Sequence, residues 1–92
     1  MSVTHELKTL APYWDAVNRG EKTFEVRRDD RGFRKGDILK LHRLRADMPT
    51  HYDMDDEFQK RTITRRITYI LAGGQFGIEP GFVVLGLEDP TP

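Results

Sequence analysis

Segments that alternate apolar and polar residues account for most of the regular structure that this chain can form. Side chains of a β-strand point to opposite faces in turn, so alternation separates an inward set from an outward set. The pattern predicts five short strands, at residues 3–9, 23–27, 38–44, 62–71 and 81–88. The last of these is apolar on both faces at its centre, which predicts a strand inside the sheet.

One segment, residues 11–20, has the features of a helix. Pro12 suits the first helical turn, and Gly20 suits the position after the cap. We expect one apolar face, made by Leu10, Tyr13, Trp14 and Val17. Because Trp14 lies on that face, core packing is favoured over stacking against a ligand.

Five strands and one helix in 92 residues predict a single domain over residues 1–92. The expected fold class is α+β or mostly β, a small and mostly antiparallel barrel with the helix packed beside it. The absence of cysteine fits a reducing compartment. No apolar run approaches the roughly 20 residues of a membrane span, and no signal peptide is evident. We therefore expect a cytoplasmic monomer without membrane contact.

The strand at residues 23–27 raises a question of side-chain direction. Alternation puts Phe24 and Val26 in the core, with Glu25 and Arg27 on the opposite face. Lys22 falls on the same side as the two apolar residues. Two alternatives stay open: the strand begins after Lys22, or its ammonium points inward beside a carboxylate.

Two other strands have clearer apolar faces. Leu39 and Leu41 are expected to face inward. In the longest strand Arg65 interrupts an apolar face formed by Ile63, Ile67, Tyr69 and Leu71.

Charge is unevenly distributed, although the formal net charge is zero. Residues 19–45 contain ten Lys and Arg against five Asp and Glu, and residues 60–66 contain four Lys and Arg. Residues 46–59 contain five Asp and Glu and no Lys or Arg. Taken alone, such runs are more often solvated surface than a site. We expect the acidic segment 46–59 to be a mobile loop that lies near the basic strands and competes with an anionic ligand, or acts as a lid or spacer.

Four motifs resemble the ASCH-like group of the PUA-like superfamily, and within it a small bacterial and phage family of unassigned function. The motifs are "HELKT", "GEKTFEVRRDDRGFRKGDIL", "RRITYIL" and "GGQFGIEPGFVVLGL". The signature comprises Gly20, Lys22, Glu25 and Arg27, followed by a Gly-Asp turn at Gly36 and Asp37. The resemblance implies a β-barrel with a helix beside it, and a cleft between them that receives RNA or a nucleotide-like ligand.

The residue types around this signature suit such a ligand. Phosphates are bound by Lys and Arg, and unstacked bases by aromatic rings and edge-reading polar groups. Candidate binding residues are His5, Lys8, Tyr13, Trp14, Lys22, Glu25, Arg27, Arg28 and Gln75. Gln75 lies in "AGGQFG", where paired glycines more often mark a tight turn. The three histidines lack metal-ligand spacing, so we expect no metal and no cofactor.

Three classes of function remain open: a module that binds single-stranded RNA or a modified nucleotide, a small hydrolase, and a protein-interaction module. The binding module is preferred. Some ASCH-like members are amidohydrolases on acetylated cytidine that use a lysine, a threonine and a glutamate, and others are linked to RNA cleavage. Lys22 matches that lysine, but Glu25 stands where the pattern has its threonine. The departure leaves Lys22 and Glu25 as an acid–base pair if the chain is an enzyme.

Overall fold

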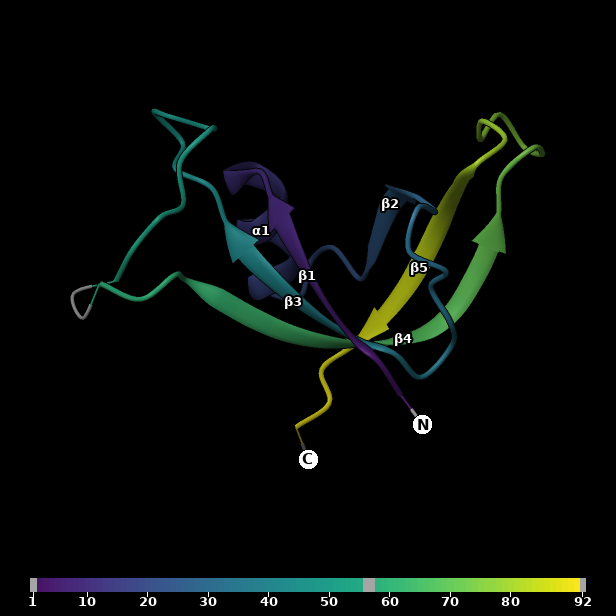
Figure 1. Cartoon of the computed structure of the whole chain (residues 1–92), viewed down its shortest axis with the longest axis horizontal. Helices are drawn as coiled ribbons and strands as arrows, with labels where there is room; N and C mark the ends of the chain where they lie inside the picture. The colour runs from purple at the N-terminus through teal and green to yellow at the C-terminus, as the bar shows by residue number, and fades with distance from the viewer. Residues whose placement is uncertain (1, 56–57, 92) are drawn as a thin grey trace.

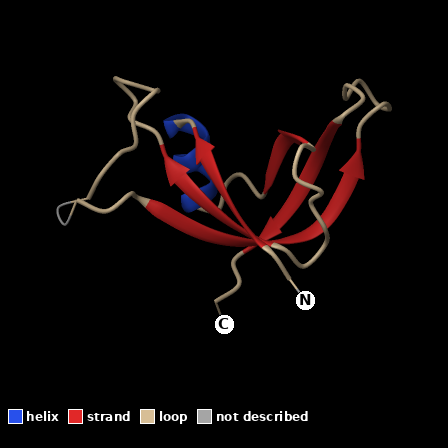
Figure 2. Cartoon of the chain, viewed as in Figure 1, coloured by secondary structure: helices blue, strands red, loops and turns tan. Residues whose placement is uncertain are grey.

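The computed structural model describes residues 2–55 and 58–91 and consists of one curled sheet with one short helix (Figures 1 and 2). The elements are β1 (Thr4–Thr9), α1 (Ala11–Asn18), β2 (Phe24–Arg28), β3 (Ile38–Arg43), β4 (Thr62–Ala72) and β5 (Phe82–Glu88). The predicted strands and helix are thus all present, with small differences at their ends. A mostly β fold with one helix is confirmed.

The sheet is mixed, with the strand order β1-β3-β4-β5-β2. β1 and β3 run parallel, and the other three pairs are antiparallel. The long strand β4 runs through both arms of the trough in Figure 1, with α1 beside β1 and β3 on one arm. β1 and β2 are the edge strands, so the sheet forms a half-barrel that stays open between them. β5 lies between β4 and β2, as its apolar faces predict.

The helix packs on β3 through a face that differs in part from the predicted one. Trp14 and Val17 are buried, and the indole Nε1 of Trp14 donates to the carbonyl oxygen of Leu41 at 2.8 Å. Leu10 and Tyr13, expected on the same face, are about half exposed. The reason is that the helix is only eight residues long and touches the sheet through one narrow stripe.

The core lies on the concave side of the sheet. Leu39 and Leu41 are fully buried there, as predicted. Arg65, which interrupts the apolar face of β4, donates from its guanidinium to the carbonyl oxygen of Val17 at 3.1 Å. The same carbonyl oxygen also accepts from the backbone N–H of Gly20 at 3.0 Å, so Arg65 adds a second donor at the end of α1 and its own guanidinium gains an acceptor beside the core.

Two predicted strand faces are wrong. Glu25 lies opposite Leu85 in the register of β2 and β5, so it faces the concave side, and Phe24 and Val26 are 44% and 51% exposed. The carboxylate can be inward because Lys22 and Arg27 pair with it, and the alternation of apolar and polar residues does not show such pairing. In β4 a β-bulge between Ile67 and Tyr69 shifts the register and leaves Tyr69 on the surface.

No helix within residues 2–55 and 58–91 is long and apolar enough to cross a membrane.

Candidate ligand cleft

Glu25 is the centre of a polar cluster at the open side of the half-barrel. Its side chain is buried, yet each carboxylate oxygen receives a cationic donor. Lys22 Nζ donates to Oε2, and Arg27 Nη2 donates to Oε1 at 3.2 Å. The conflict over Lys22 is therefore resolved by both alternatives together: β2 begins after it, and its ammonium turns back to the buried carboxylate. Three residues of the predicted signature converge on one point.

Two aromatic rings stand beside the ammonium of Lys22. Nζ lies 4.9 Å from the ring centroid of Phe24 and 5.6 Å from that of Tyr13, and it also donates to the carbonyl oxygen of Phe24 at 2.6 Å. These three residues, with Glu25 and Val26, line a hollow of about 420 Å³. The exposure of Phe24 and Tyr13 that contradicts their predicted burial thus gives the hollow its apolar walls.

A smaller hollow of about 220 Å³ adjoins the first and shares Tyr13 and Glu25 with it. Lys8 and Thr9, at the end of β1, line it from the opposite side. Arg27 Nη2 donates to Thr9 Oγ1 at 3.0 Å, which joins the two edge strands across the opening. The two hollows together form the ligand cleft. Thr9 was missed by the sequence analysis because its partner lies 18 residues along the chain and no local motif links them.

His5 and Trp14, two other candidates, support the core and line neither hollow. His5 Nε2 lies 2.8 Å from Asp37 Oδ2, in a pair that is almost fully buried. Burial alone would raise the pKa of Asp37, but hydrogen bonds from His5 and from the backbone N–H groups of Val3 and Arg34 hold that pKa below its usual value. Asp37 is the aspartate of the predicted Gly-Asp turn, and it ties the turn to β1.

Arg28 and Gln75 line neither of the two hollows. The guanidinium of Arg28 lies 4.8 Å from the ring centroid of Phe82, and Arg28 borders a third hollow of about 150 Å³, which is also lined by Phe33 and shares Arg27 with the smaller hollow of the cleft. Gln75 Nε2 donates to the carbonyl oxygen of Ala72 at 2.8 Å, within the turn between β4 and β5. That turn is tight, because a Cβ atom on Gly73 would lie 2.0 Å from the carbonyl oxygen of Glu79. Nothing in these contacts brings Gln75 to the cleft.

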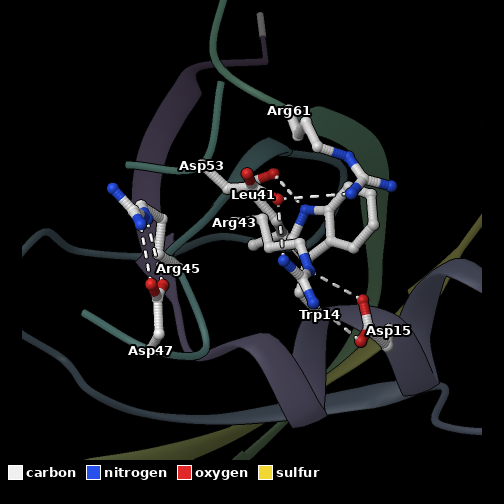
Figure 3. Close-up of polar contacts among 8 residues, drawn as sticks. All are labelled: Trp14, Asp15, Leu41, Arg43, Arg45, Asp47, Asp53 and Arg61. Carbon is white, nitrogen blue, oxygen red and sulfur yellow. Dashed lines mark hydrogen bonds and ion pairs between the residues drawn. The ribbon is translucent and has the colours of Figure 1, made fainter. Parts of the chain in front are cut away.

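A second charged cluster holds the acidic segment against the basic strands (Figure 3). Arg43 donates to Asp15 at 2.8 Å and to Asp53 at 2.7 Å, and Arg61 donates to Asp53 at 3.2 Å. Both guanidinium groups lie near the ring of Trp14, at 6.0 and 5.3 Å from its centroid. The hydrogen bond from Arg43 keeps the pKa of Asp15 below its usual value. Asp53 thus lies beside basic side chains as expected, whereas positions 56 and 57 of the acidic segment fall outside the described residues.

No group of three or more His, Asp or Glu side chains in the described ranges is placed to hold a metal ion.

The comparison with protein families assigns the chain. A family model described as "Domain of unknown function (DUF3850)" matches residues 4–87. The chain belongs to this family. The DUF3850 match includes α1, every strand but the last residue of β5, and the whole ligand cleft.

A phage protein shares part of this DUF3850 chain. It is titled "Uncharacterized 12.9 kDa protein in GpA 3'region", from Escherichia phage P2, and is 45% identical over 42 residues. The alignment covers 46% of this chain and 38% of the phage protein, so the chain spans well under two thirds of that relative. A phage relative accords with the resemblance to a small bacterial and phage family.

Proposed function

We propose that this chain is an ASCH/PUA-like domain that binds RNA or a modified nucleotide in the ligand cleft between α1 and the open side of the sheet. One observation carries the proposal. Glu25 is buried, and it holds Lys22 and Arg27 on its two oxygens at the mouth of an aromatic-walled hollow. A charged group buried in this way needs a reason beyond stability, because such pairs add little net stabilisation.

The chemistry of the cleft matches the parts of a nucleotide. A base can lie against the rings of Tyr13 and Phe24, which form the walls of a hollow of about 420 Å³. Lys8 and Arg27 line the adjoining hollow and offer cationic donors to a phosphate. The half-barrel with a single helix beside its opening is compatible with the ASCH-like architecture, which supports placing the ligand there.

Binding of short single-stranded RNA should be weak and salt-sensitive, since a few cations would release counterions from phosphates. Fluorescence anisotropy measures the affinity, and we expect it to fall between a low and a higher salt concentration. Lys22→Ala should weaken binding at least about tenfold, a loss of roughly 1.4 kcal/mol. Lys35→Ala removes an equal charge from the exposed turn before β3 and serves as the matched control. No binding of RNA by the wild type at low salt would overturn the RNA-binding form of the proposal and leave the modified-nucleotide pocket and the protein-interaction module.

A small hydrolase is the second candidate, and Thr9 is the observation that favours it. The threonine that the amidohydrolase pattern places at Glu25 is missing from β2, but the Thr9 hydroxyl reaches the same cleft from β1. Lys22, Glu25 and Thr9 thus supply a cation, a carboxylate and a hydroxyl nucleophile around two adjoining hollows.

If the hydrolase candidate is correct, the wild type should release acetate from acetylated cytidine. Thr9→Val should lower that rate at least about a hundredfold because the hydroxyl is lost, and Thr9→Ser should retain activity. Acetate release is measured by a coupled assay, and melting curves check that the variants stay folded. If the wild type releases no acetate, this hydrolase candidate is wrong and the binding module remains the proposal.

A further inference from the structure

Lys8 connects the ligand cleft to a second group of cations on the outer face of the sheet. It lines the smaller hollow, and its Nζ also lies 5.8 Å from the ring centroid of Tyr52. Lys60 Nζ lies 4.2 Å from the same centroid. Lys8 pairs with His42 in the β1–β3 register, and the His42 ring meets Tyr52 edge to face at 5.9 Å. We call Lys8, Tyr52 and Lys60 the outer track; sequence analysis singled out neither Tyr52 nor Lys60.

Glu6, which shares the exposed face of β1 with Lys8, is engaged with another group. Glu6 Oε1 lies 2.9 Å from His42 Nε2, and His42 Nδ1 lies 2.7 Å from Thr62 Oγ1. The hydrogen bond and charge of His42, with smaller contributions from Lys40 and Lys60, hold the pKa of Glu6 below its usual value. Among the described residues, Lys40 and Lys60 thus act on a Glu6 carboxylate that is already bonded to a histidine.

We propose that the ligand is a single-stranded RNA segment longer than one nucleotide, with one nucleotide in the cleft and neighbouring phosphodiesters along the outer track. This inference rests on the proposed function and selects RNA over an isolated nucleotide. The ammonium groups of Lys8 and Lys60 are held near the Tyr52 ring at exposed sites, where a cation–π contact contributes only about 0.5–1 kcal/mol. Each ammonium can therefore turn to a phosphate oxygen. The Tyr52 ring keeps the two lysine side chains close to one another.

The test compares two ligands, uridine 5′-monophosphate and an oligouridine of about ten nucleotides, which falls within the site sizes of single-strand binders. Lys60→Ala should weaken oligouridine binding several-fold at low salt and lower the salt slope by about 0.7, the value for one phosphate contact on a single strand. Tyr52→Ala should also weaken it. Neither change should alter binding of the monophosphate, because neither residue lines the cleft.

Arg66→Ala is the matched control. Arg66 is partly exposed, pairs with Glu88 on β5 and contributes the same charge, but it lies outside the outer track. We expect it to change neither affinity. Binding of oligouridine without detectable binding of the monophosphate would also support the inference. The outer track would be wrong if Lys60→Ala binds oligouridine with the affinity and salt slope of the wild type. It would also be wrong if Arg66→Ala loses as much oligouridine affinity as Lys60→Ala. The cleft proposal stands in both cases. If the wild type binds neither ligand, the proposed function itself fails.

Discussion

Glu25→Gln should weaken binding of short single-stranded RNA at least about tenfold, even though the change removes a negative charge next to an anionic ligand. Simple electrostatics gives the opposite sign. The expected loss arises because the carboxylate holds Lys22 and Arg27 at one point, and a neutral amide cannot accept from both cations as strongly. Glu25 is thus a positioning residue, and anisotropy titrations at low salt measure the effect.

Glu21→Gln makes the same change of charge four residues earlier and serves as the control. Glu21 is exposed and pairs with Arg19, so its loss should leave binding equal or slightly tighter. Glu25→Gln should also lower the free energy of unfolding by about 1–3 kcal/mol, since a buried acceptor is weakened. Tighter RNA binding by Glu25→Gln would show that the carboxylate only offsets positive charge, and the proposed role of the cluster would be wrong.

Trp14→Ala should lower the free energy of unfolding by about 3–5 kcal/mol, because the ring is almost fully buried and fills the space between α1 and the sheet. The change also removes the indole donor to the carbonyl oxygen of Leu41. In a chain of this size, each kcal/mol corresponds to about 4–8 °C in the melting temperature. Urea unfolding, together with thermal melts, measures the loss.

Two further variants separate the causes at this helix. Trp14→Phe keeps an aromatic ring but removes the N–H donor, so it should cost less than the alanine variant, although the carbonyl of Leu41 loses its partner. Tyr13→Ala, one position earlier on α1, should cost about 1 kcal/mol or less because its ring is half exposed. A Trp14→Ala variant as stable as Tyr13→Ala would contradict the packing described for α1.

Local patterns were sufficient to find the elements of this fold. Alternation located all five strands, and Pro12 with Gly20 located the helix. The same patterns were less reliable in predicting which side chains of β2 and β4 face the core. Phe24 and Val26 lie outward, and Tyr69 follows a bulge that a period-two pattern does not register.

Part of the candidate site was also predictable from a local pattern. Lys22, Glu25 and Arg27 lie within six residues, so a short motif carries them, and the structure brings them together. Thr9, Tyr52 and Lys60 come from other segments, and a single sequence contains no signal of their proximity. His5 and Trp14, chosen for their residue types, have their polar atoms satisfied within the core.

The sequence by itself determined the number, order and type of the elements, because strand and helix periodicities depend on neighbouring residues. It also determined the charged signature before and within β2. The tertiary structure decided that the sheet closes only to a half-barrel and that Glu25, not Phe24, points inward. Burial of a carboxylate depends on two cations and on an aromatic hollow assembled from α1, β1 and β2. The two cations are close in sequence, but their pairing with Glu25 compensates the cost of desolvating the charge only once the chain has folded.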